Sequence, residues 1–498
     1  MDVINLLESR AKRTPEKTAV IFKDQNISFL QLKDNSFRLA DSLFGLGVNK
    51  SDKVAIYLPS CPQYFYAYLA IWSLGATAVP LDFMLTEDEL ISCISHCEAK
   101  TLILKTKANI SLDKLKSACP SLKNIITCFE KKEGCFGLEE LIARGKNAAP
   151  KAAVNDKDYA IIFYTSGTTG KPKGVLINYL QLGAAPKSMG FFVDLNEKDI
   201  VLCALPFSHS GGLIHIQNCV SFGITIVIME RFIPLEFIRN IQAYRVTCFW
   251  IVPSMYYAFL QLKEFESFDL SSLRWMVTFG ASNSPDALKR FHKYCPDAHL
   301  LNGWGMTETN APTVVLPMGS TKIESVGRPL PWVDIKIFDD AGKEVAQGRV
   351  GEIVCRGWVV TDGYFKDPET TKEAIRNGWF HTGDLGRFDE EGHLYIVGRK
   401  KEMIKVGGEI VFEPEVEAAI QKHPDVAETA VVGVNDNLRG EVPKAFVVLK
   451  DNKNLEEEDL RYFLRQHLAH FKIPHYFEFK PALPKNRTGK IDKELLRK

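Results

Sequence analysis

The sequence predicts an α/β protein. We expect a large N-terminal domain of layered sheets and helices, which includes a β-rich part, and a small mobile α+β C-terminal domain. The 498 residues exceed what one hydrophobic core usually spans, so two or more domains are expected. Helical patterns alternate with short runs rich in β-branched residues up to about residue 400, where the pattern changes. The predicted domains therefore span residues 1–398 and 399–498.

The N-terminal segment is predicted to form a helix. Residues 1–17 (MDVINLLESRAKRTPEK) have an amphipathic pattern with acidic residues, unlike the basic start and apolar core of a signal peptide. The longest apolar stretches, such as residues 220–229 (VSFGITIVIM), are well short of the roughly 20 residues of a membrane helix. These features predict a cytoplasmic protein without a transmembrane segment.

Short β-rich runs predict the strands of the N-terminal domain. They are residues 53–57 (KVAIY), 100–104 (KTLIL), 123–128 (KNIITC), 159–164 (YAIIFY) and 224–229 (ITIVIM). Their alternation with helical patterns favours sheets flanked by helices. Between residues 327 and 399, short strands with turns, such as VDIKIFDDAGKEV and GEIVCRG, predict the β-rich part.

The C-terminal domain is predicted to contain two helices and two strands. The helices are residues 413–421 and 460–471, and the strands are residues 429–434 and 444–449. In the second helix, apolar residues recur at helical spacing on both sides of His467, so His467 is interpreted as part of a helix face rather than as a ligand.

Charge and cysteine content exclude several classes of function. Lys and Arg number 62 against 61 Asp and Glu, so no electrostatic footprint for nucleic acid is present. The 11 cysteines form no disulfide framework, which is typical of a reducing cytosol.

Cys93, His96 and Cys97 lie close enough in the sequence to suggest a metal site. No second pair of ligands is near them, so ordinary packing is the favoured interpretation.

A glycine- and hydroxyl-rich loop follows the strand at residues 159–164. It reads YTSGTTGKPKG, and it is not a P-loop, because Gly167 and Gly170 are only three residues apart and Lys171 is followed by Pro172. Glycines let backbone amides approach an anion, and Lys171 and Lys173 add positive charge. The loop is therefore a candidate phosphate cradle, with an ordinary polar hairpin as the alternative.

A second motif, NGWGMTET, spans residues 302–309. Trp304 is suited to stacking on a base or a substrate, and Glu308 is a hard oxygen ligand suited to magnesium. The alternative is a capped helix start, with Thr307 as the cap and Glu308 in the first turn.

Three further motifs carry polar groups in glycine-rich turns. Asp384 in HTGDL could accept hydrogen bonds from two vicinal ribose hydroxyls, or could form a structural Asx turn. Arg399 and Lys405 in GRKKEMIKVGG surround a flexible joint, or form a solvated charge cluster. Lys490 in PKNRTGK could swing into a cleft, although basic tails are common.

Together these motifs resemble the adenylate-forming superfamily of acyl-CoA synthetases, luciferases and peptide-synthetase adenylation domains. YTSGTTGKPKG, NGWGMTE, HTGD, GRKKEMIK and PKNRTGK occur in one order over most of the chain, and ALPFSHSGG at residues 204–212 matches the segment that lines the carboxylate pocket. The resemblance, closest to fatty-acid–CoA ligases, implies an enzyme that joins a carboxylic acid to ATP with Mg²⁺, releases pyrophosphate and transfers the acyl group to coenzyme A.

The resemblance also implies roles for individual residues. The β and γ phosphates would be held by Thr165, Ser166, Gly167, Thr168, Thr169, Gly170 and Lys173. The adenine would be bordered by Gly280, Ala281, Ser282, Gly303, Trp304, Gly305 and Met306. Glu308 would hold Mg²⁺, Thr307 would contact the α-phosphate, and Asp384 with Arg399 would hold the ribose. Lys490 would bridge the carboxylate and the α-phosphate.

The resemblance further implies that the C-terminal domain rotates between two half-reactions. The hinge residue aligns with Lys401, and rotation would bring Lys405, Gly407 and Gly408 to the thioester site. Many relatives have Tyr at the position of Trp304, so we expect ring stacking to survive while a phenolic hydrogen bond is lost.

The pocket segment favours an uncharged acid. It lacks the Asp that pairs with an amino acid's amino group in peptide-synthetase domains, and Phe207, His209 and Val252 are the candidate pocket residues. A medium- or long-chain fatty acid is the preferred substrate. The alternatives are an aryl acid, transfer to an acyl carrier protein, a luciferase-like oxygenase and a nucleotide-binding regulator. A homodimer is compatible with these features.

Overall fold

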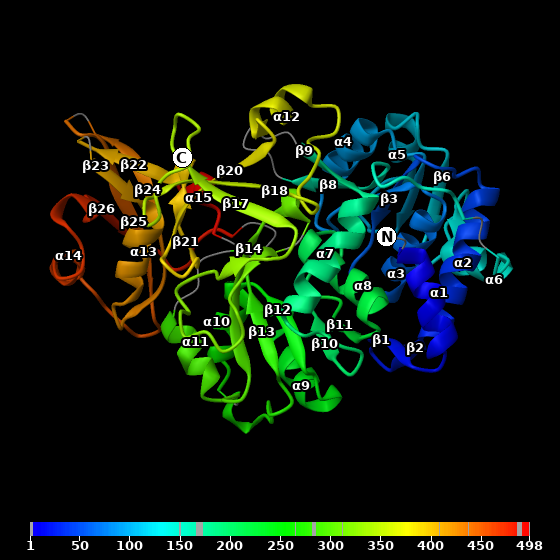
Figure 1. Cartoon of the computed structure of the whole chain (residues 1–498), viewed down its shortest axis with the longest axis horizontal. Coiled ribbons are helices and arrows are strands. Elements are labelled where there is room, and N and C mark those ends of the chain that lie inside the picture. The colour runs from blue at the N-terminus through cyan, green and yellow to red at the C-terminus, as the bar shows by residue number, and fades with distance from the viewer. Residues whose placement is uncertain are drawn as a thin grey trace.

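The computed structural model describes residues 3–148, 151–165, 173–263, 265–280, 285–310, 312–407, 409–436, 438–485 and 491–497. Two large sheets dominate the N-terminal part (Figure 1). The seven-stranded sheet has the order β7-β6-β5-β3-β4-β8-β9. Its strands are β3 (Lys53–Tyr57), β4 (Thr77–Pro80), β5 (Thr101–Leu104), β6 (Asn124–Thr127), β7 (Phe136–Gly137), β8 (Tyr159–Thr165) and β9 (Lys173–Asn178).

The nine-stranded sheet has the order β16-β15-β14-β13-β12-β10-β11-β1-β2. Its strands are β1 (Thr18–Phe22), β2 (Gln25–Ser28), β10 (Ile200–Cys203), β11 (Thr225–Ile228), β12 (Cys248–Ile251), β13 (Trp275–Thr278), β14 (His299–Gly305), β15 (Pro312–Val315) and β16 (Arg328–Pro329). Strands β10 to β14 are parallel. Buried parallel strands have continuous apolar sequences, and β11 corresponds to the predicted strand at residues 224–229.

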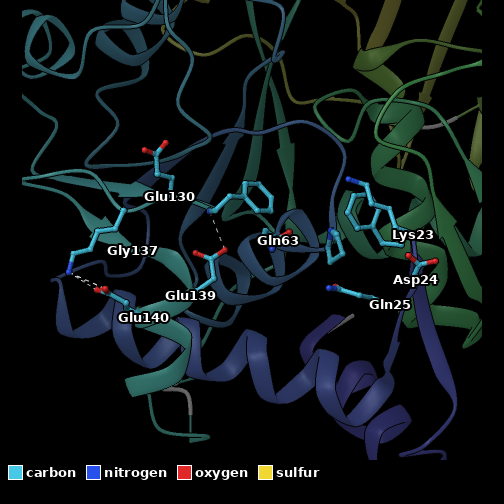
Figure 2. Close-up of a pocket in the computed structure, with 12 residues that line it drawn as sticks. Lys23, Asp24, Gln25, Gln63, Glu130, Gly137, Glu139 and Glu140 are labelled. Carbon is cyan, nitrogen blue, oxygen red and sulfur yellow. Dashed lines mark hydrogen bonds and ion pairs between the residues drawn. The ribbon is translucent and has the colours of Figure 1, made fainter.

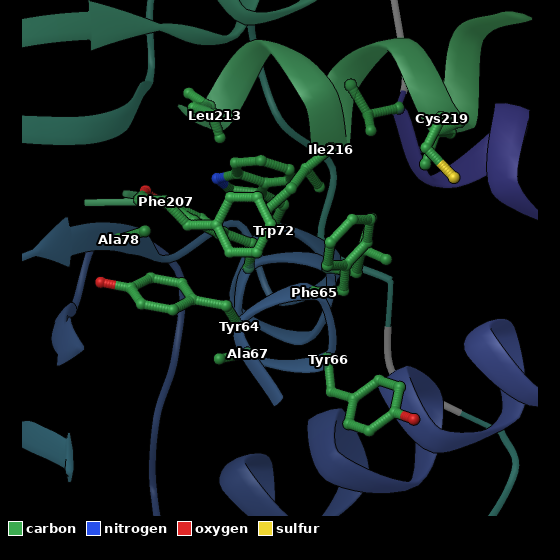
Figure 3. Close-up of a cluster of buried hydrophobic side chains, with 14 of the residues drawn as sticks. Tyr64, Phe65, Tyr66, Ala67, Trp72, Ala78, Phe207, Leu213, Ile216 and Cys219 are labelled. Carbon is green, nitrogen blue, oxygen red and sulfur yellow. The ribbon is translucent and has the colours of Figure 1, made fainter. Parts of the chain in front are cut away.

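Helices fill the space between the sheets and cover their outer faces. The central layer contains α1 (Val3–Arg13), α2 (Phe29–Gly45), α3 (Pro62–Ser73), α6 (Leu138–Arg144), α7 (Tyr179–Phe192) and α8 (Ser210–Phe222), which contribute to one core. The outer layers contain α4 (Glu87–Cys97) and α5 (Leu112–Ala118) on one sheet, and α9 (Pro234–Tyr244), α10 (Pro253–Leu260) and α11 (Pro285–His292) on the other. In the central layer, aromatic side chains of α3 pack against Leu213 and Ile216 of α8 (Figure 3).

The β-rich part is a five-stranded antiparallel sheet. Its elements are β17 (Val333–Phe338), β18 (Gly351–Gly357), α12 (Pro368–Ala374), β19 (Ile375–Arg376), β20 (Trp379–Phe388) and β21 (Leu394–Arg399). The predicted change of pattern near residue 327 is therefore confirmed, and GEIVCRG forms the whole of β18.

The C-terminal part has a separate core and a mixed α and β composition. Its elements are β22 (Met403–Val406), β23 (Glu409–Phe412), α13 (Glu413–Gln421), β24 (Val426–Asp436), β25 (Gly440–Leu449), α14 (Glu457–Arg465), β26 (Tyr476–Phe479) and α15 (Lys493–Leu496). The fold class predicted from the sequence is confirmed. In the described part of the chain, no helix combines the length and apolarity that crossing a membrane requires.

One predicted element was too long. The apolar spacing predicted a helix over residues 460–471, but α14 ends at Arg465 and a separate helical turn forms at His470–Lys472. Leu468 and Phe471 still pack on the same core, so the periodic pattern reflects two segments that share one core. His467 is exposed beyond α14, and its ring stacks on Phe463 with 4.4 Å between the ring centres.

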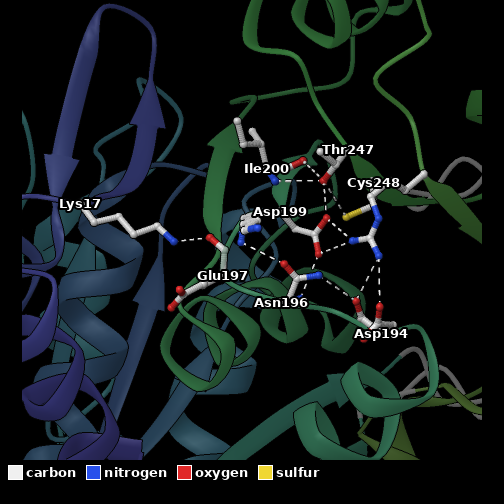
Figure 4. A network of polar contacts seen from close by, with 10 residues as sticks. Lys17, Asp194, Asn196, Glu197, Asp199, Ile200, Thr247 and Cys248 are labelled. Atoms are coloured by element: carbon white, nitrogen blue, oxygen red, sulfur yellow. Dashed lines mark hydrogen bonds and ion pairs between the residues drawn. The ribbon is translucent and has the colours of Figure 1, made fainter.

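An ion pair between a buried carboxylate and a partly exposed guanidinium joins the starts of the central strands (Figure 4). Arg274 donates to both carboxylate oxygens of Asp199, at 2.6 and 2.8 Å, and Asp199 is 1% exposed. The hydroxyl of Thr247 donates to the same carboxylate at 2.7 Å. The pair lies where β10, β12 and β13 begin, which is the edge opposite to the one where these strands end.

Replacing Arg274 by Met should lower the free energy of unfolding by about 2 kcal/mol, because a buried carboxylate would lose its counter-charge while partial exposure of Arg274 moderates the loss. The fall would appear as a lower urea midpoint. Arg245→Met is the matched control, because its pair with Asp269 is 60% and 51% exposed and is worth less than about 1 kcal/mol. Equal losses of unfolding free energy in the two variants would show that the pair of Arg274 and Asp199 stabilises the protein no more than an exposed pair does.

Candidate active site

Several predicted site residues lie at one edge of the nine-stranded sheet. Strands β10, β12, β13 and β14 are parallel, so the segments that follow them meet at their carboxyl ends. These segments carry Phe207 and His209 after β10, Val252 after β12, Gly280 after β13, and Met306, Thr307 and Glu308 after β14, which itself contains Gly303 and Gly305. In open α/β sheets, ligands bind at this edge.

The predicted phosphate loop begins and ends on paired strands. Thr165 at the end of β8 is in register with Lys173 at the start of β9. The Lys173 ammonium lies 5.7 Å from the centre of the Tyr364 ring. The loop residues Ser166, Gly167, Thr168, Thr169 and Gly170 lie outside the described residues.

Glu308 lies in a short helical turn after β14 and is held from two sides. Its carboxylate accepts a hydrogen bond from the Tyr364 hydroxyl at 3.0 Å, and its backbone carbonyl accepts one from the Thr361 N–H at 2.7 Å. Loss of hydration raises the pKa of the Glu308 carboxyl above its usual range. Tyr364 thus connects the predicted metal ligand to Lys173.

Tyr364 itself is fixed by strand β9. The neighbouring Phe365 donates its backbone N–H to the Gly174 carbonyl at 2.7 Å, and Tyr364 forms an isolated bridge with Val175. Sequence reasoning missed Tyr364. The available signal was the run TDGYF at residues 361–365, a glycine turn with a hydroxyl-bearing aromatic residue.

Trp304, Asp384 and Arg399 form a second group. The indole N–H of Trp304 donates to Asp384 Oδ2 at 2.8 Å, and Arg399 Nε lies 3.0 Å from Asp384 Oδ1. Asp384 and Arg399 are register partners on β20 and β21. Trp304 is 7% exposed and packs with Val314 of β15 and with apolar residues of the β-rich part. The indole therefore makes a hydrogen bond to the predicted ribose ligand.

The candidate pocket residues have different environments. His209 precedes α8, and its Nε2 lies 3.0 Å from Asp82 Oδ2, which follows β4 of the other sheet. Val252 is half-buried at the start of α10. The side chain of Phe207 is fully buried and packs edge-on against Phe65 of α3 (Figure 3), so its predicted contact with a substrate has no support from its position.

The predicted hinge segment is exposed and lies between β21 and β22. Lys401 is in a short helical turn, where the adjacent Lys400 forms an ion pair with Asp340 at 2.7 Å. Lys405 is also exposed, and Gly407 has a φ of +58°, a conformation that favours glycine. These residues are not among the contacts of Glu308 or Asp384 described above.

Comparison with known proteins decides the family. The profile described as AMP-binding enzyme matches residues 7–365, and the profile described as AMP-binding enzyme C-terminal domain matches residues 415–490. The chain belongs to the AMP-binding enzyme family. This confirms the resemblance to the adenylate-forming superfamily and the predicted enzyme class, an acid–thiol ligase.

The relatives of this AMP-binding enzyme act on different acids. A long-chain-fatty-acid–CoA ligase of Bacillus subtilis is 32% identical and covers 98% of this chain and 92% of that protein. An indoleacetate–CoA ligase of Aromatoleum aromaticum is 32% identical over 100% of this chain and 98% of that protein. The solved o-succinylbenzoate coenzyme A synthetase of Bacillus subtilis, in complex with ATP and magnesium ion, has a TM-score of 0.85 and is 30% identical over 98% of both chains.

The donor set of this AMP-binding enzyme fits magnesium. A carboxylate that accepts one hydrogen bond from a neutral hydroxyl keeps lone pairs for a cation, as Glu308 does. The described residues contain no group of three or more His, Cys, Asp or Glu side chains able to hold a metal. Mg²⁺ is commonly held by one or two carboxylates together with substrate phosphates and water, which agrees with this arrangement.

Four further predicted residues lie outside the described part of the chain. They are Ala281, Ser282, Gly408 and Lys490. The segments on both sides of Lys490 are described, and there Lys485 forms an isolated bridge with Ile491. The roles of these four residues remain predictions from the family resemblance.

The cavity in Figure 2 is lined by other residues than the predicted site residues. It has a volume of about 710 Å³ and is lined by the β1–β2 turn, the start of α3 and residues near α6. Its charges are of both signs and partly neutralise one another, as in the 2.9 Å pair of Lys131 and Glu140. None of the predicted site residues lines this cavity. The candidate site is therefore assigned from the residues at the carboxyl edge of the sheet and not from the size of a cavity.

Proposed function

We propose that this enzyme joins a carboxylic acid to ATP, releases pyrophosphate, and transfers the acyl group from acyl-AMP to coenzyme A. The observation that carries this proposal is that two polar groups meet at the end of β14. Trp304 of β14 donates a hydrogen bond to Asp384, which pairs with Arg399, and Glu308 in the following turn accepts a hydrogen bond from Tyr364. One group suits a ribose, and the other suits a metal-bound phosphate.

The proposed roles follow from the charges of the reaction. A carboxylate that attacks a triphosphate brings negative charges together, so cations must offset the repulsion and hold the reacting oxygens in line. Lys173 and the loop that precedes it would hold the β and γ phosphates, and Lys490 would contact both the carboxylate and the α-phosphate. Glu308 would hold Mg²⁺, which supplies positive charge to the phosphates.

Asp384 would position the nucleotide. A carboxylate can accept hydrogen bonds from two vicinal hydroxyls, and the contacts with Trp304 and Arg399 would hold the carboxylate in place. Thr307 would contact the α-phosphate, and Gly280 with residues 303–306 would border the adenine. His209 and Val252 would lie beside the acid at the same edge of the sheet.

The preferred acid is a medium- or long-chain fatty acid, because the pocket segment carries no acidic residue to pair with an amino acid. An aryl acid is the second candidate. It is favoured by the aromatic layer beneath α8, where the Trp250 and Trp275 rings meet with 4.8 Å between their centres. Relatives act on both classes of acid.

The proposal is tested by measuring pyrophosphate release with Mg-ATP across fatty, aryl and amino acids, with and without coenzyme A. We expect turnover that requires coenzyme A and prefers one class of fatty or aryl acid. Release that is independent of coenzyme A, or that occurs only with amino acids, would contradict the proposal.

We also propose that residues 399–498 rotate as a unit about Lys401. Replacing Lys401 by Pro fixes φ and restricts this rotation, so transfer to coenzyme A should fall about tenfold or more while adenylation is retained. Each half-reaction is measured separately, by pyrophosphate release and by consumption of supplied acyl-AMP. Lys401→Ala, which leaves φ unrestricted, should retain both. A Pro variant with both steps intact would exclude Lys401 as the hinge.

A further inference from the structure

Helix α8 has two different faces. Leu213 and Ile216 point toward α3 in the central layer (Figure 3). At about 100° per residue, His215 lies nearly opposite Leu213, and Asn218 lies one turn further along on the side of His215. The His215 ring meets the Trp250 ring of β12 edge-on, with 5.0 Å between the centres. The second face of α8 is therefore turned toward the nine-stranded sheet.

This face brings polar side chains into an apolar layer. His215, Asn218 and the nearby Trp275 of β13 are all 0% exposed. Elements α8, β12 and β13 are fully described, and among the described residues His215 Nε2, both polar side-chain atoms of Asn218, and Trp275 Nε1 have no hydrogen-bond partner. Buried polar atoms are nearly always paired in folded proteins, so these atoms require a hydrogen-bonding group that the described residues do not supply.

The hydrogen bonding of His215 defines what this ligand must offer. Its Nδ1 lies 3.2 Å from the Gly212 carbonyl oxygen, which can only accept, so Nδ1 carries the hydrogen. Burial lowers the pKa of His215 to about 4, so the ring is neutral near pH 7 and Nε2 is an acceptor. Trp275 Nε1 can only donate, and Asn218 can do both. A hydroxyl is uncharged and both donates and accepts, so it matches the hydrogen-bonding capacity of each of these groups.

The depth of His215 sets the position of that hydroxyl. His209 immediately precedes α8 at the carboxyl edge of the sheet, and His215 is six residues further along. We propose that the acid carries a hydroxyl group about 9 Å from its carboxylate, because six helical residues span 1.5 Å each. This hydroxyl would donate a hydrogen bond to His215 Nε2 and accept one from Asn218 or Trp275. This inference rests on the proposed function, in which the reacting carboxylate lies at that edge.

The test compares matched acids on the intact enzyme. Pyrophosphate release with coenzyme A is measured for phenylpropanoate and its para-hydroxy derivative, and for octanoate and omega-hydroxyoctanoate. In at least one pair, the hydroxylated acid should have a kcat/KM about tenfold or more above its partner, because a site built to bind a hydroxyl rejects the analogue that lacks it. No preference in either pair would overturn the inference.

Variants then assign the preference to the polar cluster. His215→Phe and Asn218→Leu remove the hydrogen-bonding atoms, so the ratio of kcat/KM values within the preferred pair should fall at least about fivefold, whereas His215→Gln should retain part of it. Using a ratio of two acids cancels any general loss of active enzyme. Ile216→Leu, on the opposite face of α8, is the control and should leave the ratio unchanged.

The outcomes separate the two proposals. Unchanged ratios in the variants of His215 and Asn218 would overturn the inference alone, as would turnover of both acids at equal rates. If no acid supports pyrophosphate release, the proposed function fails and the inference fails with it. If His215→Phe does not fold, the ratio of kcat/KM values can still be measured with Asn218→Leu and His215→Gln.

Discussion

Replacing Glu308 by Gln should reduce kcat/KM for pyrophosphate release by about 10²- to 10³-fold, because the amide keeps the shape of the side chain but removes the charge that would hold Mg²⁺. The Mg²⁺ concentration needed for half-maximal rate should rise. The measurement is a magnesium titration of pyrophosphate release at saturating ATP and acid.

The same substitution should not destabilise the protein near pH 7. The pKa of Glu308 is raised in the folded state, so the ionised carboxylate costs stability above its ordinary pKa, and that cost disappears when the group is neutral. We expect the melting temperature of the variant at pH 7 to equal or exceed that of the parent protein. As the pH falls, the melting temperature of the parent protein should rise relative to that of the variant.

Glu344→Gln is the control for Glu308→Gln. Glu344 is 55% exposed in an ion pair with Lys336, so its substitution should change neither the activity nor the magnesium dependence. If Glu308→Gln left the magnesium dependence unchanged, Glu308 would not be the metal ligand. Loss of activity accompanied by a clearly lower melting temperature would assign it a structural role.

Replacing Lys490 by Ala should separate the two half-reactions. Adenylate formation should fall about 10³-fold, because the ammonium group would no longer offset charge between the carboxylate and the α-phosphate. Thioester formation from supplied acyl-AMP should stay within about threefold, since rotation of the C-terminal domain would already withdraw Lys490 from that step. Single-turnover measurements of each step give the comparison.

Lys485→Ala is the matched control in the same C-terminal segment. Lys485 pairs with Glu428 at 2.9 Å within the C-terminal part, so its loss should leave both half-reactions intact. Equal losses of adenylation and thioester formation in Lys490→Ala would contradict the proposal of two conformations.

The sequence predicted much of the candidate site because glycines, hydroxyls and charges occur there in compact motifs. It could not predict how motifs far apart in the chain make contact. Trp304 and Asp384 are 80 residues apart in the chain, and they form a hydrogen bond only because the tertiary structure brings β14 and β20 together. Tyr364 was not predicted for the same reason, because only the tertiary structure places its hydroxyl next to Glu308.

Position also altered the interpretation of single residues. Phe207 belongs to a motif that matches a pocket segment, yet its side chain is buried against α3. His215 lies only three residues beyond that motif and drew no attention, because a histidine in an apolar stretch is usually a packed core residue. Its unpaired Nε2 becomes visible only when α8 is placed on the sheet.

The sequence by itself determined the fold class, several strands of the two large sheets and the family motifs, because these depend on local periodicity and on short runs of special residues. Only the tertiary structure decided where α14 ends, which side chains meet at the carboxyl edge, and which buried polar atoms lack partners. Hydrogen bonding and burial between distant segments depend on how the layers pack, and no local pattern in the chain records that packing.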